Sequence, residues 1–244
     1  MNGAVILAVT GAVAGAALAP LLRGVVVRHA VPYGEALQAA CPHCARAVRA
    51  LPPSGRCPGC GGRLGPGTGQ VEAVAAAVGA TVLWTVAAGA PDALPLLWTA
   101  GFGVVLGFVD GAVRRLPDAL TLRLGLGLAV LLPLAALVAG TPGASVRCLW
   151  VALAAGLLFE VPAWFGLLGG GDSRLALSLG AVLGRYGWGT AFTALFLASA
   201  AAGLWGTARA LAAWARRRPA RGIELPFGPF MLVGTLLAIV LAQG

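Results

Sequence analysis

The sequence predicts an all-α fold: a polytopic transmembrane bundle of about eight helices, with one small loop domain outside the membrane. Hydrophobic residues make up 59% of the 244 residues, and charged residues only 10%. A soluble domain carries about 25% charged residues, so this composition indicates a membrane protein. Long apolar runs recur along the chain, and one long polar stretch interrupts them.

The apolar runs set the expected helices. A hydrocarbon core of about 30 Å requires about 20 helical residues. Eight runs are predicted as spans, at 2–22, 70–90, 94–109, 120–139, 146–168, 175–183, 188–214 and 227–242. The sixth is short, and it is either a half-span or fused with its neighbour. The first is not expected to be a cleaved signal peptide, because no basic region precedes it and more spans follow.

The positive charge is distributed in a way that sets the orientation. The net charge is +9, and all 17 basic residues are arginine. With both termini outside, 15 of them fall in or beside the inner loops, and only Arg147 and Arg185 fall outside. This is the positive-inside bias of membrane proteins, and it argues against nucleic-acid binding. Asp92 then lies in a short outer turn, where a charge is harmless. The inner arginines are 23, 28, 46, 49, 56, 63, 114, 115, 123, 174, 209, 216, 217, 218 and 221.

The chain therefore divides into a first span (1–22), a cytoplasmic loop (23–69) and a membrane core (70–244). The loop carries two CxxC pairs, Cys41/Cys44 and Cys57/Cys60, with twelve residues between them. Four thiolates at this spacing suit a closed tetrahedral zinc site with a structural role. Two disulfides are the competing interpretation, but a reducing cytoplasm favours metal. His43 could replace one cysteine, although four cysteines already complete the site.

Three carboxylates gather at the inner membrane boundary. Asp110 ends the third apolar run, Asp118 begins the fourth after Pro117, and Asp172 follows Gly169-Gly170-Gly171. A carboxylate at a membrane boundary is costly unless it is solvated, paired or used. Asp118 is best explained as a helix N-cap. For Asp110 and Asp172, a solvated loop charge and a functional group both remain open.

Two other acidic residues lie on predicted spans. Glu72 at a helix start is favourable through the helix dipole and needs no function. Glu160 lies inside the fifth run, where an ionisable group is a functional hypothesis by default. Pro162 is expected to break that helix locally and admit water.

Asp110 and Asp172 end at the same inner surface, with one out-and-back helical pair between them. Two carboxylates within a few Å of each other share a proton. The charged one can activate a water while the protonated one polarises a peptide carbonyl. This is the chemistry of an aspartyl protease, and it requires neither a metal nor a nucleophilic serine or cysteine.

The sequence resembles the type IV prepilin peptidases, which are membrane aspartyl proteases with a GxGD motif. Four features carry the resemblance along most of the chain: the four-cysteine loop; Asp110 with the 115–121 stretch RLPDALT; Gly169-Gly170-Gly171-Asp172-Ser173-Arg174; and the 225–230 stretch LPFGPF. The resemblance implies that Asp110 and Asp172 are catalytic. It marks Asp118, Gly169, Gly171 and Arg174 as accessory positions.

The resemblance also implies a substrate and a location. Members cleave the basic leader of prepilins and pseudopilins after a glycine, for type IV pili and type II secretion. They act at the cytoplasmic face of the bacterial inner membrane, and their partners are leader peptides and the lipid bilayer. Many also methylate the new N-terminus with S-adenosylmethionine. Ala19 stands where the family usually has Asn, and the 67–72 stretch departs from its pattern, which leaves methylation open.

Two other functions remain as alternatives. A non-enzymatic zinc-ribbon membrane scaffold for pilus or secretion assembly would tolerate replacement of both aspartates. A transporter with a proton relay through Asp110, Glu160 and Asp172 would spread its carboxylates across the membrane depth. Asp110 and Asp172 are expected at one face, which argues against a relay.

Overall fold

The computed structural model describes residues 2–89, 92–165, 169–216 and 226–243, and within these ranges it contains eight α-helices and no strand. The all-α prediction is confirmed, and each predicted run contains one helix. The ends of several predicted features, Ala90, Leu168 and Leu225 among them, and the arginines at 217, 218 and 221 lie outside the described residues. The helices are α1 Asn2–His29, α2 Gln70–Ala87, α3 Ala93–Val113, α4 Asp118–Val138, α5 Gly143–Trp164, α6 Gly170–Tyr186, α7 Trp188–Ala215 and α8 Phe227–Leu241.

Six of these helices, α1 to α5 and α7, are long and apolar enough to cross a membrane. Helix α8 is apolar but only 15 residues long, and α6 has 17 residues. Large apolar side chains such as Val130, Leu137 and Phe196 are more than 60% exposed, as expected for helices that face lipid.

Several helix bounds differ from the expected spans. Helix α1 continues through Arg23 to His29, seven residues beyond the apolar run, and this extension packs against the cysteine loop, where Val27 shares a buried cluster with Val48 and Leu51. Helix α6 begins at Gly170, so part of the glycine run is helical. Helix α5 continues past Pro162 to Trp164, so the expected break is absent.

Small residues allow the helices to approach closely. A Cβ on Gly11 of α1 would come within 2.1 Å of the carbonyl oxygen of Gly79 on α2. A Cβ on Gly184 of α6 would meet Cys148 Cα on α5 at 2.5 Å, and one on Gly234 of α8 would meet the Ala194 carbonyl oxygen on α7 at 2.7 Å. Close backbone contact through glycine is a major source of helix association in lipid. Helices α1 and α2, α5 and α6, and α7 and α8 accordingly form adjacent pairs.

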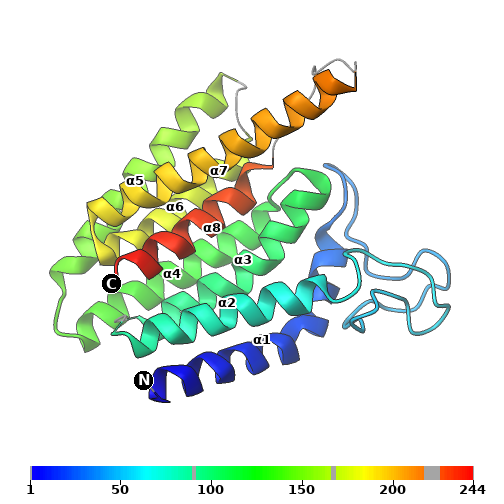
Figure 1. Cartoon of the computed structure of the whole chain (residues 1–244), viewed down its shortest axis with the longest axis horizontal. Coiled ribbons are helices and arrows are strands. Elements are labelled where there is room, and N and C mark those ends of the chain that lie inside the picture. The colour runs from blue at the N-terminus through cyan, green and yellow to red at the C-terminus, as the bar shows by residue number, and fades with distance from the viewer. Residues whose placement is uncertain (1, 90–91, 166–168, 217–225, 244) are drawn as a thin grey trace.

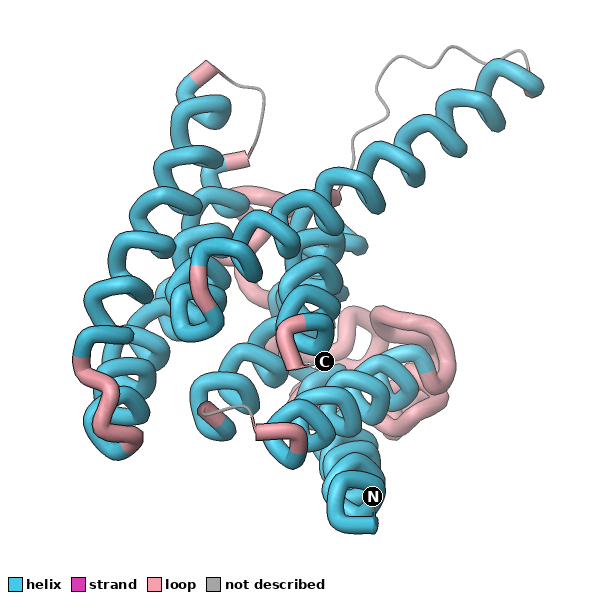
Figure 2. Tube along the Cα trace, turned by 60° about the vertical axis from the view of Figure 1, so that its left-hand side comes forward, coloured by secondary structure: helices cyan, strands magenta, loops and turns pink. Residues whose placement is uncertain are grey.

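The bundle has two chemically different ends. Both termini lie at one end, and the cysteine loop projects from the other (Figure 1). The last turns of α7 extend away from the remaining helices, with Leu204, Trp205 and Trp214 exposed (Figure 2). The cysteine loop is irregular apart from two isolated bridges, Ala40 with Ala47 and Arg56 with Arg63.

The end that holds the termini contains a buried ion pair, which corrects the prediction that Asp92 is a harmless charge in an outer turn. Asp92 is 2% exposed, and its Oδ2 accepts from Arg185 Nε at 2.5 Å. Arg185 also donates to Thr141 Oγ1 at 3.2 Å, and so joins the starts of α3 and α5 to the end of α6. A charge in so dry a position requires a partner, and the sequence offered no sign that Arg185 supplies it.

Candidate active site and metal centre

Asp110 lies in the last turn of α3 and is buried, with 4% of its surface exposed. This excludes the interpretation of Asp110 as a solvated loop charge. The backbone N–H of Gly228, in the first turn of α8, donates to Asp110 Oδ2 at 3.0 Å. A Cβ on Gly228 would come within 2.8 Å of that oxygen, so only glycine lets the α8 backbone reach the carboxylate undisturbed.

Asp172 lies in the first turn of α6, where it is partly buried. Its own backbone N–H donates to the Gly169 carbonyl at 3.0 Å, which fixes the start of the helix. The Asp172 carboxylate is close enough to Asp110 to act on it electrostatically. The two carboxylates, from the end of α3 and the start of α6, therefore lie at the same end of the bundle, near enough to interact electrostatically.

The two flanking glycines differ in their surroundings. A Cβ on Gly171 would come within 2.9 Å of Leu116 Cβ, in the turn between Asp110 and Asp118. A Cβ on Gly169 would meet Asp172 Oδ2 at 3.6 Å, which is ordinary contact. Gly171 thus allows the start of α6 to lie against the α3–α4 turn, where a side chain would clash. The space around Gly169 would accept a Cβ.

Asp118 is not the N-cap that the sequence predicted. Pro117 occupies the cap position of α4, and Asp118 is the first helical residue, with no side-chain cap hydrogen bond. Its carboxylate instead forms an ion pair with Arg174 on α6, and both side chains are more than half exposed. Proline at the cap leaves the Asp118 side chain available for this partner from another helix.

The α3–α4 turn also contacts the cysteine loop. Arg114 has a left-handed backbone (φ 53°) and donates its N–H to the Asp110 carbonyl, which ends α3. Arg115 donates to the Pro32 carbonyl at 3.0 Å and lies over the Tyr33 ring, 5.9 Å from its centre. The turn that follows Asp110 is therefore held by the loop that precedes α2.

The four loop cysteines form one cluster, and none of them is in a disulfide. Their sulfur atoms all lie within 4.8 Å of one another, with Cys41–Cys60 at 3.7 Å and Cys44–Cys57 at 3.6 Å. Zinc–sulfur bonds of about 2.3 Å place tetrahedral thiolates about 3.8 Å apart. The four residues can thus hold a metal ion such as zinc, with no position left open for a substrate. His43 is outside this ligand set.

The two CxxC pairs have the same local structure. In the first, Ala45 N–H donates to the Cys41 carbonyl and Cys41 N–H to the Arg46 carbonyl. In the second, Gly61 and Gly62 occupy the equivalent positions around Cys57. The backbone N–H groups of Gly59 and Cys60 lower the pKa of Cys57 to about 6, because they stabilise its thiolate. A thiolate is the form that binds a metal.

Glu72 has a partner, Arg23, that was not predicted from the sequence. Arg23 is fully buried at the end of the first apolar run, and its guanidinium holds the Glu72 carboxylate at 2.5 Å and 3.3 Å. It also donates to the carbonyls of Pro66 and Gly67, at 2.8 and 3.2 Å. Opposite charges at the end of one apolar run and the start of the next were the available sign of this pair.

Glu160 remains apart from the site. It is partly buried near the end of α5, and no described residue makes a hydrogen bond or ion pair with its side chain. The next-door Phe159 packs on Phe227, with ring centres 5.6 Å apart. The neighbourhood of Glu160 is therefore linked to the start of α8 by packing alone.

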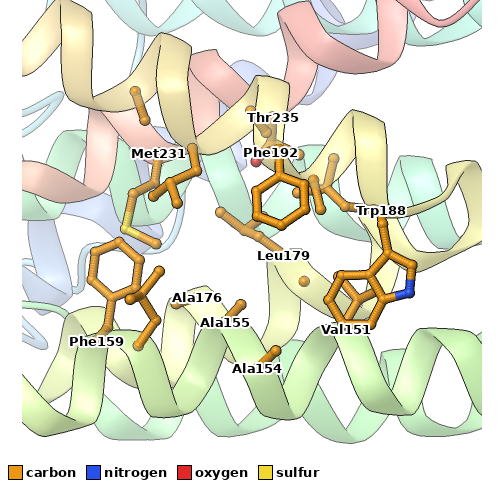
Figure 3. A pocket seen from close by; sticks show the side chains of 17 residues that line it. Val151, Ala154, Ala155, Phe159, Ala176, Leu179, Trp188, Phe192, Met231 and Thr235 are labelled. Carbon is orange, nitrogen blue, oxygen red and sulfur yellow. The ribbon is translucent and has the colours of Figure 1, made fainter.

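Two apolar cavities of about 300 Å³ flank α8 in the membrane part of the bundle. One lies between α5, α6, α7 and α8, with Phe159 and Met231 together near one end and Trp188 at the other (Figure 3). The second lies on the other side of α8, against α2 and α3, and reaches Phe108 and Pro229. Phe108 is two residues from Asp110, and Pro229 follows Gly228, so this cavity reaches the helix turns that carry Asp110 and Gly228.

No family model matches the sequence, and neither a curated protein nor a solved structure gives a match. The functional assignment therefore depends on the residues and contacts described above.

Proposed function

We propose that this protein is a membrane-embedded aspartyl endopeptidase that removes the N-terminal leader of prepilins or pseudopilins. Asp110 and Asp172 are its catalytic residues. The observation that carries the proposal is that these two carboxylates, one from the end of α3 and one from the start of α6, lie at the same end of the bundle and interact electrostatically. The resemblance of the sequence motifs to those of the prepilin peptidases supplies the substrate class.

The pair supports peptide hydrolysis without a metal. One carboxylate takes a proton from a water, whose oxygen bonds to the scissile carbonyl carbon while the other carboxyl protonates the carbonyl oxygen. The tetrahedral intermediate then releases the amine as the C–N bond breaks, and the leaving nitrogen takes the proton that came from water. The other carboxylate takes back a proton from a hydroxyl of the intermediate, whose carbon becomes the carboxyl carbon of the product. One water is consumed, and the pair again holds one proton.

The remaining parts of the proposal concern metal, location and methylation. Zinc on the four cysteines has a structural role, because a closed site binds no substrate. The arginine distribution favours a cytoplasmic position for the cysteine loop and the aspartates, in a bacterial inner membrane. Methylation with S-adenosylmethionine follows from the family resemblance alone, and transfer of a labelled methyl group to a cleaved pilin tests it.

The central experiment is cleavage of a purified prepilin by the purified protein in lipid vesicles. Mass spectrometry of the products should show loss of the leader after its final glycine. Asp110→Asn and Asp172→Asn should each abolish cleavage while they leave the expression level and helical content intact. Asp118→Asn is the matched control, because its carboxylate is exposed and engaged elsewhere. Substantial cleavage by both single variants would overturn the proposal and favour the scaffold alternative.

A further inference from the structure

We infer that Asp110 carries the shared proton on Oδ1 and that Asp172 is the charged member that activates water, with Gly228 as the positioning residue that determines which oxygen of Asp110 bears the proton. This inference rests on the proposed function. It adds which of the two aspartates carries the proton and which activates water. The Gly228 hydrogen bond selects the oxygen of Asp110, and the helix ends and the burial of the two side chains select the carboxyl group.

The Gly228 hydrogen bond distinguishes the two oxygens of Asp110. An amide N–H can only donate, so Oδ2, at 3.0 Å from the Gly228 nitrogen, must be an acceptor. A proton on Oδ2 would compete with the amide hydrogen for the space between the two atoms. The proton of a neutral Asp110 therefore lies on Oδ1, the oxygen that remains available to a substrate carbonyl.

The helix ends place the negative charge on Asp172. Asp172 lies in the first turn of α6, where the helix dipole and free N–H groups stabilise an anion. Asp110 lies in the last turn of α3, where the dipole disfavours one. The two aspartates thus lie at opposite electrostatic ends of their helices, although both are at the same end of the bundle.

Burial acts in the same direction. Asp110 is 4% exposed, whereas Asp172 is only partly buried and can be reached by water. Dry surroundings penalise the charged form of a carboxyl group.

Asp172 is also the described charged group that acts electrostatically on Asp110. Among the elements packed on α3, the other described charges near this end include three with partners: Arg23 with Glu72, Asp118 with Arg174, and Arg115 with the Pro32 carbonyl. The last turn of α1 adds Arg28 and His29. Arg114 has a partner as well. Helix α8 carries no titratable side chain between Phe227 and Leu241.

The first test compares two variants of one position by the pH dependence of prepilin cleavage. Gly228→Ala and Gly228→Pro both add a Cβ beside Asp110, but only Gly228→Pro removes the N–H, and proline is tolerated in the first turn of a helix. The N–H favours the ionised form of Asp110, so its loss lets Asp110 keep its proton to higher pH. Relative to Gly228→Ala, the alkaline limb of kcat for Gly228→Pro should move up by about one pH unit.

The position of the shifted limb decides the assignment. A shift of the acidic limb instead would make Asp110 the charged member and overturn the inference. Equal pH profiles with a lower kcat in Gly228→Pro would reduce Gly228 to a structural residue and also overturn it. In both cases the wild-type protein still cleaves, so failure of the inference is distinct from failure of the proposed function.

A second measurement does not require activity or a folded Gly228→Pro variant. A hydrophobic carbodiimide reacts with protonated carboxyl groups, and mass spectrometry locates the adduct. In the wild-type protein in vesicles at neutral pH, Asp110 should be modified in preference to Asp172. Access alone would give the reverse order, because Asp172 is the more exposed of the two. Preferential modification of Asp172 would overturn the assignment.

Discussion

Gly171 lies so close to Leu116 that a Cβ on Gly171 would come within 2.9 Å of Leu116 Cβ and 3.2 Å of the Leu116 carbonyl oxygen. This contact sets how near the start of α6 can come to the turn after Asp110. The distance between the two carboxylates depends on that approach. A small change at Gly171 should therefore affect catalysis before it affects folding.

Gly171→Ala is expected to reduce leader cleavage strongly with little loss of helical content. The added methyl group must push α6 from the α3–α4 turn, and a displacement of about 1 Å can cost about 100-fold in rate. The measurement is kcat on a purified prepilin in vesicles. Gly169→Ala is the matched control, because its Cβ would meet only ordinary contact at 3.6 Å, and it should keep most of its activity. Equal loss in both variants would show that the glycine run acts through helix formation rather than through the Leu116 contact.

Asp118→Asn should retain most of the cleavage activity, whereas Asp110→Asn should lose it. The Asp118–Arg174 pair is exposed at both ends, and pairs of this kind contribute about 0–1 kcal/mol. Cleavage assays of the two variants side by side check this. If Asp118→Asn were inactive and Asp110→Asn active, the first catalytic aspartate would be Asp118 and not Asp110.

Removal of one partner from the Arg23–Glu72 pair should destabilise the protein. Arg23 is fully buried, so Glu72→Ala leaves an unpaired buried charge, which typically costs about 3–5 kcal/mol. Thermal unfolding in detergent should show a lower Tm. The double variant Arg23→Met/Glu72→Met should lose less than the sum of the single variants, because no charge is then stranded. Additive losses would indicate that Arg23 acts through the Pro66 and Gly67 carbonyls instead.

Zinc should bind with one ion per chain through Cys41, Cys44, Cys57 and Cys60. Elemental analysis of Cys57→Ser should show strong loss of metal, while Cys148→Ser, a buried cysteine of α5 outside the cluster, should keep it. Acid should also release the metal, because protons compete with it for the thiolates. A protein that holds no metal and carries two intact disulfides in the cell would contradict this prediction.

Loss of the metal should affect the loop more than the membrane helices. Limited proteolysis after chelation should cut within residues 30–69, because the two CxxC turns lose the ion that joins them. The circular dichroism signal of the helices should change little. The contacts of the loop with helix α1, from Leu51 to Pro20 and from Pro66 to Arg23, should slow cleavage near Leu51 and Pro66.

The positions of the helices could be predicted from the amino-acid order, because a membrane requires about 20 apolar residues per crossing and a helix satisfies its backbone locally. The cysteine turns are also formed by residues close together in the sequence. Each CxxC pair forms its own turn, so spacing alone indicated four ligands, and the structure brings their sulfur atoms together. Asp110 and Asp172 could also be predicted to share one end, since an even number of crossings returns the chain to the same side.

Partners that come from distant helices were decided only by the tertiary structure. Nothing local predicts that Asp118 meets Arg174, that Asp92 meets Arg185, or that the Gly228 amide reaches Asp110. Helix length is set by the hydrocarbon thickness, but the rotation of a helix about its axis and the distance to its neighbour are set by side-chain packing. The close contacts of Gly171 and Gly228 restrict the rotation of their helices and the distances to the neighbouring helices. The relative position of the two carboxylates depends on that rotation and on those distances.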